Sequence, residues 1–249
     1  MRLIIHILLF LFISTSIIAK EKGQTEITTE DGIEVFQNEK YYLLKKNVKI
    51  HSDNFILRAD IVKINFNKNL YDITKIDAKG TVNFDSSKNK MNGIGEKLVF
   101  DVQNEILNID GYNSRLITTD MQMHSDGIIN VNNSNGKFFL KGPNSKLISE
   151  NIFIRANTIK GIFTNVDGKN EVTKLNVEDK KISYVKNRET EMYAKTINFD
   201  NSISIIELID DVTIIRNEEK ITGDYGTLDT RNNSYKIKSN NQNKVKVII

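Results

Sequence analysis

The feature that most constrains the fold is a short unit that recurs along the chain. The unit is a small residue, a polar residue, apolar residues at every second place, and then Asp or Asn; the clear copies are 59–65 (ADIVKIN), 95–101 (GEKLVFD) and 194–200 (AKTINFD). Looser copies begin at Ser125 and Ala156. With a last copy at Gly223, the starts at 59, 95, 125, 156, 194 and 223 give steps of 36, 30, 31, 38 and 29 residues. A period of this size is typical of stacked supersecondary units.

Each repeat corresponds to about one hairpin. Apolar and polar residues alternate through most of the chain, which predicts strands, and helical spacing is not sustained beyond the first nineteen residues. A lone hairpin cannot bury its apolar face, so successive hairpins must stack and line one continuous interior. At 8–12 residues for a strand and its turn, the chain would hold about 19 to 29 strands. We therefore expect an elongated all-β domain whose ends are open sheet edges.

Five of the Asp-Gly and Asn-Gly pairs in the sequence provide the expected turns. They are Asp31-Gly32, Asn92-Gly93, Asp110-Gly111, Asn135-Gly136 and Asp167-Gly168. Such pairs tolerate positive φ and favour two-residue hairpin turns.

Composition excludes several classes of protein. A net charge of +3 with dispersed Lys and Arg gives no basis for a nucleic-acid surface, and the absence of cysteine excludes disulfides and thiolate chemistry. The histidines are His6, His51 and His124, and none has a partner at metal-ligand spacing. No nucleophile elbow or phosphate-cradling loop occurs. We therefore predict no catalytic residue, no metal and no cofactor, and a carboxylate-only enzyme is the last alternative.

The N-terminus is typical of a secretory signal. Arg2 precedes an apolar run and Ala19 precedes Lys20, which predicts a signal peptide over 1–19 and a single domain over 20–249. An uncleaved anchor is the alternative, although the run is short for a spanning helix.

These residues carry a family resemblance. Short motifs at the start of predicted strands each lie near a copy of the unit: 46–50 (KNVKI), 79–84 (KGTVNF) and 210–214 (DDVTI). The last residues, ITGDYGTLDTRNNSYKI…KVKVII, have the same pattern. The chain resembles the OstA/LptA family of periplasmic lipopolysaccharide-transport proteins, whose fold is shared with LptC and the N-terminal part of LptD. The resemblance runs from about Ile33 to Ile249. The repeats are loosest between 111 and 168, so the sequence does not decide whether a groove would be continuous through this region.

The resemblance implies a twisted antiparallel β-jelly roll, open at both ends, in the periplasm. It implies lipopolysaccharide as ligand, with acyl chains in an apolar groove and direction supplied by an ATP-driven complex elsewhere. It also implies LptC-like and LptD-like partners joined by edge-strand pairing, with a head-to-tail homo-oligomer as a further assembly. A non-enzymatic lipid carrier bridging the two membranes is the expected function.

The alternating apolar residues are the predicted lipid-binding set. They are Ile50, Leu57, Ile64, Phe66, Val82, Phe84, Leu98, Phe100, Ile197, Phe199, Val212 and Ile214. An ordinary packed core has the same pattern, so the family resemblance alone distinguishes a groove from a core.

Charged residues in the repeats admit two interpretations. Lys45, Lys46, Arg58 and Arg216 are candidates for binding lipid phosphates, and otherwise are surface charges that protect edges. The acidic residues Asp60, Glu96 and Asp224 are more simply turn or surface residues than a metal site.

Two rival functions stay open. One is a membrane-tethered, LptC-like subunit of the same pathway, anchored by an uncleaved 3–19 segment. The other is a structural β-solenoid or adhesin-like envelope protein with a dry interior, which would bind no lipid.

Overall fold

The structure, a computed structural model, describes residues 24–150, 152–240 and 244–248. Its regular elements are strands, which form one 18-stranded antiparallel sheet. They are β1 (Glu26–Thr28), β2 (Ile33–Phe36), β3 (Tyr41–His51), β4 (Ile56–Phe66), β5 (Ile73–Ser86), β6 (Met91–Asp101), β7 (Ile106–Asp110), β8 (Ser114–Thr118), β9 (Met121–Ser125), β10 (Ile128–Asn132), β11 (Lys137–Ser149), β12 (Ile152–Val166), β13 (Lys169–Asn187), β14 (Thr190–Asp200), β15 (Ile205–Arg216), β16 (Glu219–Asp229), β17 (Ser234–Lys238) and β18 (Lys246–Ile248). No helix in the described ranges is long and apolar enough to cross a membrane. The predicted signal segment lies outside them.

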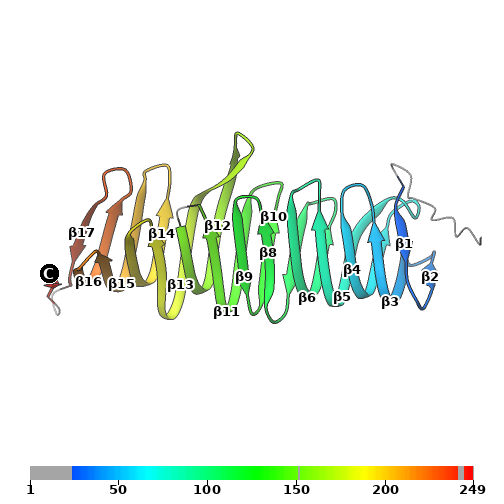
Figure 1. The fold of residues 1–249 in the computed structure, drawn as a ribbon, viewed down its shortest axis with the longest axis horizontal. Helices are drawn as coiled ribbons and strands as arrows, with labels where there is room; N and C mark the ends of the chain where they lie inside the picture. Colours follow the sequence, from blue (N-terminus) through cyan, green and yellow to red (C-terminus); the bar gives the residue numbers. More distant parts are fainter. Residues whose placement is uncertain (1–23, 151, 241–243, 249) are drawn as a thin grey trace, which may run out of the picture.

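The sheet is folded into two facing layers. Most long strands change register about halfway, for example between Lys45 and Val48 in β3 and between Ile209 and Val212 in β15. A bulge bends and twists a strand, so each long strand runs through one layer, turns a corner and continues in the other. The strands lie side by side along the long axis, with β1 and β2 at one end and β17 at the other (Figure 1). Each long strand belongs to both layers and is counted once. The sheet therefore has 18 strands, fewer than the range of about 19 to 29 that the sequence predicts.

The two layers are defined by their pairing. Layer A comprises 33–36, 41–45, 61–66, 73–79, 97–101, 106–110, 128–132, 137–141, 158–178, 196–200, 205–209, 225–229 and 234–238. Layer B comprises 26–28, 48–51, 56–59, 82–86, 91–95, 114–118, 121–125, 145–149, 152–156, 183–187, 190–194, 212–216, 219–223 and 246–248. Corners join the layers along one side, and the hairpin turns of both layers face each other along the other side, which we call the mouth.

The repeated unit of the sequence is a corner followed by a layer A strand. Its small first residue lies at the inside of the corner, where the layers converge; Ala194 is fully buried, and a side chain at Gly95 would lie 2.5 Å from Ile109 Cγ2. Where the second residue is Asp60, Asp126 or Asp224, its carboxylate accepts a hydrogen bond from a backbone N–H of a neighbouring corner. Asp60 Oδ2 lies 3.0 Å from Thr81 N, for example. Bulges leave such N–H groups without a ladder partner, so these acids satisfy the backbone.

The last residue of the unit caps the turn that follows. Asp101, Asp200 and Asp229 each accept a hydrogen bond from a backbone N–H two or three residues further along. The unit therefore marks both ends of a layer A strand, with its apolar residues facing the interior between them.

Predicted turns are only partly observed. Asp167-Gly168 forms the tip of the β12–β13 hairpin, which projects beyond the other hairpins (Figure 1), and both residues have positive φ. The prediction for Asn92-Gly93 is wrong, because both residues lie inside β6 and pair with β5. Gly93 is needed there for space, since an added Cβ would lie 2.7 Å from Ile109 Cδ1.

The core consists of apolar rows that cross the whole sheet. One row in layer A pairs Leu44, Val62, Ala78, Leu98, Ile109, Ile129, Leu140, Ile159, Val177, Ile197 and Leu208 in succession. One row in layer B pairs Ile50, Leu57, Phe84, Gly93, Leu116, Met123, Leu147, Ile154, Val185, Met192, Ile214 and Ile221. The predicted all-β, elongated antiparallel jelly roll of stacked hairpins is confirmed.

Candidate functional site: the interlayer groove

The groove is the space between the inner faces of the two layers, and it contains every predicted lipid-binding residue. Layer A contributes Ile64, Phe66, Leu98, Phe100, Ile197 and Phe199. Layer B contributes Ile50, Leu57, Val82, Phe84, Val212 and Ile214. The alternation therefore places the two sets opposite each other. Only Phe100 and Phe199 are partly exposed, and the rest are buried.

The groove is continuous through the region where the repeats are loosest. Leu116, Met123 and Leu147 continue the row of layer B without interruption. Ile129 and Leu140 do the same in layer A. The two layers change here in one respect: β7 and β8, and likewise β9 and β10, are separate short strands on either side of the corner.

At the mouth of the N-terminal half, the layers meet through aromatic side chains. The rings of Phe84 in layer B and Phe100 in layer A are 6.3 Å apart between centroids. Phe55, in a layer B turn, lies 5.9 Å from Phe84. These contacts are apolar throughout.

The middle of the mouth contains two hollows separated by a polar bridge. Asp120 Oδ2, in a layer B turn, accepts a hydrogen bond of 2.9 Å from Asn170 N in layer A. One hollow, of about 500 Å³, is lined by side chains that include Met91, Met121 and Phe163. The other, of about 530 Å³, has Phe199 in its lining. Both open between the layers, so the groove is accessible here.

Sequence reasoning missed the residues around these hollows. Met91, Met121, Met123 and Phe163 all line the first hollow. The alternation of Met121 and Met123 was a signal for an inner face, but both lie in the loosely repeated region. Methionine and phenylalanine adapt to irregular apolar ligands, which suits a lipid-binding groove.

At the C-terminal end, the mouth is held by hydrogen bonds. Arg216 Nη1 in layer B donates to the carbonyl oxygen of Asn233 at 3.2 Å. Tyr235 Oη donates to Glu219 Oε2 at 2.6 Å, and this hydrogen bond together with burial raises the pKa of Tyr235. We call these two contacts the C-terminal latch.

The other charged candidates lie on the surface, where the two lysines form ion pairs. Lys45 pairs with Glu34 at 2.5 Å and Lys46 with Glu30 at 3.4 Å, near the N-terminal edge. Arg58 is exposed on layer B. Within the described ranges, no three His, Asp or Glu side chains gather as a metal ion would require.

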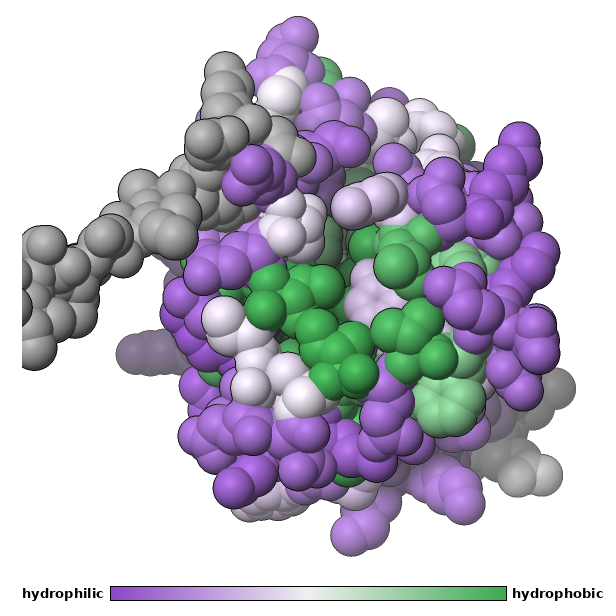
Figure 2. Space-filling view, turned by 90° about the vertical axis from the view of Figure 1, so that its right-hand side faces the viewer, coloured by the Kyte–Doolittle hydropathy of each residue, from purple (hydrophilic) through white to green (hydrophobic). Residues whose placement is uncertain are grey.

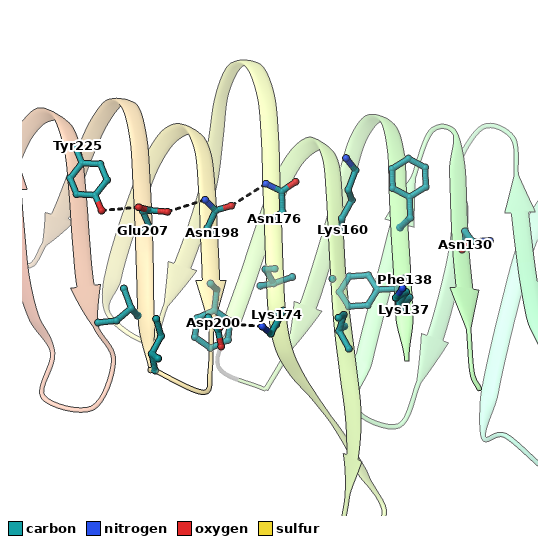
Figure 3. Close-up of a pocket in the computed structure, with 17 residues that line it drawn as sticks. Asn130, Lys137, Phe138, Lys160, Lys174, Asn176, Asn198, Asp200, Glu207 and Tyr225 are labelled. Carbon is teal, nitrogen blue, oxygen red and sulfur yellow. Dashed lines mark hydrogen bonds and ion pairs between the residues drawn. The ribbon is translucent and has the colours of Figure 1, made fainter. Parts of the chain in front are cut away.

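A further hollow, of about 900 Å³, is lined mainly by outer-face side chains of layer A, and also by Phe138, Leu175 and Phe199 of its inner face. We call it the outer pocket; Figure 3 shows its lining across β10 to β16. Four of its polar side chains, Asn176, Asn198, Glu207 and Tyr225, form a hydrogen-bonded row.

Residues 26–136 match the family described as LptA/(LptD N-terminal domain) LPS transport protein. The predicted resemblance is confirmed over this segment. We call residues 26–136 the LptA-type segment; it contains the aromatic contacts at the mouth and the N-terminal edge. Among solved structures, the chain is similar to LptH, "the LptA homologous periplasmic component of the conserved lipopolysaccharide transport device from Pseudomonas aeruginosa", with 10% identity over 91% of this chain and 94% of that chain and a TM-score of 0.23. No curated protein matches the chain.

Proposed function

We propose that this protein is a non-enzymatic periplasmic carrier that binds the acyl chains of lipopolysaccharide between its two layers. The observation that carries the proposal is the pair of facing apolar rows, which run unbroken from one end of the sheet to the other. A groove of constant chemistry along its length lets an acyl chain occupy many equivalent positions. The match of the LptA-type segment supports lipopolysaccharide as the lipid.

Lipid binding requires the layers to separate at the mouth. The inner rows are fully packed, with Leu44, Ile64 and Ile154 wholly shielded from solvent. An acyl chain therefore replaces side-chain contacts with lipid contacts, and each buried CH₂ contributes about 0.8 kcal/mol. The corners are continuous backbone and can act as the fixed side of the opening, while Phe100 and Phe199 at the mouth are the first side chains an acyl chain meets.

The free strand edges support end-to-end assembly. At the N-terminal end, Ile33 and Val35 of β2 are 50% and 45% exposed. Figure 2 looks onto this end and shows apolar side chains gathered in its centre within a hydrophilic rim. At the other end, Val247 and Ile248 of β18 are 49% and 48% exposed. Edges of this kind pair with another strand, so we propose LptC-like and LptD-like partners, and a head-to-tail homo-oligomer as the self-association.

Photocrosslinking to lipopolysaccharide tests the carrier function. A crosslinking residue is placed at Phe100, Phe199 or Ile214, with Lys180, exposed outside the groove, as the control. Adducts at the groove positions and none at Lys180 are expected. Absence of adducts at every position in a folded protein would contradict lipid transport.

A structural β-solenoid is the second candidate, because the inner rows are packed as in a dry core. It predicts no adducts at any groove position. A membrane-tethered, LptC-like role is distinguished separately, by the mass of the mature protein, since cleavage after Ala19 would remove the N-terminal segment.

A further inference from the structure

The outer pocket contains a row of polar side chains joined to one another. Tyr225 Oη donates to Glu207 Oε1 at 2.7 Å, and Asn198 Nδ2 donates to Glu207 Oε2 at 3.1 Å. Asn176 Nδ2 donates to Asn198 Oδ1 at 3.0 Å. Figure 3 shows these groups side by side on successive strands. Because each group fixes the next, the row is preorganised, and it presents both donors and acceptors to a ligand.

The charges around the row are mixed. Lys137, Lys160 and Lys174 line the pocket, but so do Asp200 and Glu207. Lys174 is paired with Asp200 at 3.0 Å. A polyanion would meet the two carboxylates on β14 and β15, and a cationic ligand would meet the lysines on β11, β12 and β13. The electrostatics therefore favour a ligand that is largely neutral and rich in hydrogen-bonding groups.

Apolar side chains lie beside the polar row. Phe139, Ile162, Ile203 and Ile205 belong to the same lining, and Ile203 is 56% exposed. Exposed apolar groups next to fixed polar groups match a ligand that has hydroxyl groups on its edge and C–H groups on its faces. Sugar rings have this chemistry.

The length of the outer pocket indicates more than one sugar. Its lining extends from Asn130 on β10 to Tyr225 on β16, and the hydrogen-bonded row occupies the β13 to β16 part of it. From β10 to β16 there are six neighbouring strand spacings in layer A, which is roughly 29 Å at about 4.8 Å each. A single ring would cover only part of it.

We propose that the outer pocket binds an oligosaccharide, with the hydrogen-bonded row of Asn176, Asn198, Glu207 and Tyr225 contacting its hydroxyl groups. The hydrogen-bonded row lies on the outer face of layer A, whereas the groove lies on the inner face, so the row can bind sugars whether or not lipid occupies the groove. Its ligand is either the glycan of a glycolipid or a separate polysaccharide; the two share this chemistry.

Isothermal titration calorimetry on the full mature chain tests the site. The probes are maltohexaose and the acyl-free oligosaccharide released from lipopolysaccharide by mild acid hydrolysis and then dephosphorylated, so that both are largely neutral. Glu207→Gln removes the charged acceptor at the centre of the row, and the affinity should fall about tenfold or more, as for a lost hydrogen bond to a charged group. Asn176→Ala should weaken binding about fivefold.

Glu219→Gln is the matched control. Glu219 accepts a hydrogen bond of 2.6 Å from a tyrosine hydroxyl, just as Glu207 accepts one of 2.7 Å. Glu219 lies at the C-terminal latch, outside the outer pocket. This variant should bind the sugar like the unchanged protein. Binding of the released oligosaccharide alone would identify a glycolipid as the source, and binding of maltohexaose as well would identify a broader glycan specificity.

Two results would overturn the proposal. One is that the unchanged protein binds neither probe. The other is that Glu219→Gln weakens binding as much as Glu207→Gln while both variants retain their thermal unfolding temperature. Neither result bears on lipid transport, because photocrosslinking in the groove needs no sugar at the outer pocket.

Discussion

The two ends of the mouth close the same groove by different chemistry. In the N-terminal half, the LptA-type segment closes it through the rings of Phe55, Phe84 and Phe100, at centroid distances of 5.9 and 6.3 Å. In the C-terminal half, the latch closes it through Arg216 and Tyr235, whose hydrogen bonds cross between the layers. Below the mouth, both halves have the same apolar rows.

This difference has a consequence for lipid binding. An acyl chain that separates two phenyl rings replaces one apolar contact with another, so little free energy is lost. An acyl chain that separates the latch leaves an arginine, a carbonyl oxygen and a carboxylate without their partners, which is unfavourable in an apolar surrounding. We therefore infer that lipid enters the N-terminal half and the middle of the groove more readily than the C-terminal end.

The largest expected effect is the loss of lipid capture in Phe100→Asp. Phe100 is at the mouth and partly exposed, so the new carboxylate can reach water and the fold should persist. Lipid capture should fall to background, because a charge on the acyl path must be desolvated. Bound lipopolysaccharide per mole of protein and the unfolding temperature are measured together.

Leu98→Asp is the comparison for that variant. Leu98 is on the same strand but 1% exposed, so its carboxylate would be buried and the protein should unfold. If Phe100→Asp lost stability and lipid in equal measure, Phe100 would belong to a plain core rather than to the groove.

The next effect concerns the C-terminal latch. Arg216→Met keeps an unbranched apolar stem and removes the bond to Asn233, which should lower the free energy of unfolding by about 1 kcal/mol. Adducts from a crosslinker at Ile214 should increase, since the mouth opens more easily. The matched control is Arg231→Met, because Arg231 pairs with Asp229 at 2.8 Å without crossing the layers. Equal adduct yields in the two variants would show that the latch does not restrict lipid.

The bridge at the middle of the mouth should have a local effect. Asp120→Ala leaves the Asn170 N–H without its acceptor, whereas Asp120→Asn keeps an oxygen in place. Amide hydrogen exchange at Asn170 should accelerate in the first variant and much less in the second. Unchanged exchange in both would mean that the bridge does not hold the layers together in solution.

The sequence predicted the inner faces well and the mouth poorly. Alternation specifies which face of a strand is apolar, so residues such as Ile64 and Ile214 were assigned to the interior before any register was known. The distance of a residue from the mouth depends on where its strand bends and where its turn lies. Asn92-Gly93 shows the difficulty, because a pair typical of a turn lies within β6, where glycine is required for packing.

The same limit explains which site residues were missed. Tyr225, Glu207 and Asn176 are far apart in sequence, and only the antiparallel register brings them into one row. Met121 and Phe163 line the same hollow because a layer B turn faces a layer A hairpin across the mouth. Which residues become neighbours depends on where the strands bend from one layer into the other. The repeated unit recurs at each of these bends, but its sequence does not reveal that the strand bends there.

The smallest expected effect is a difference in acid sensitivity between the two halves. The final Asp of the repeated unit caps a layer A turn in each half: Asp101 in the N-terminal half, Asp200 and Asp229 in the C-terminal half. Hydrogen bonds from Asn104 lower the pKa of Asp101. Hydrogen bonds from Ser202 and Lys174 lower the pKa of Asp200 from 3.8 to about 2, and those from Arg231 lower the pKa of Asp229 to about 2.

The sign of the effect follows from these shifts. A carboxyl whose pKa is lower in the folded state contributes stability that is complete above its unfolded pKa and is lost as the pH falls through the folded value. The urea midpoint should therefore decline between about pH 4 and about pH 2. The decline should be shallower in Asp200→Asn, with Glu39→Gln as the control that removes an exposed turn carboxyl. Because these groups are exposed, the effect should be small. As the pH falls, hydrogen exchange should show the turn after β6 loosening before the turns after β14 and β16, because Asp200 and Asp229 stay ionised to lower pH. The reverse order would show that the cationic partners Lys174 and Arg231 do not protect the C-terminal turns.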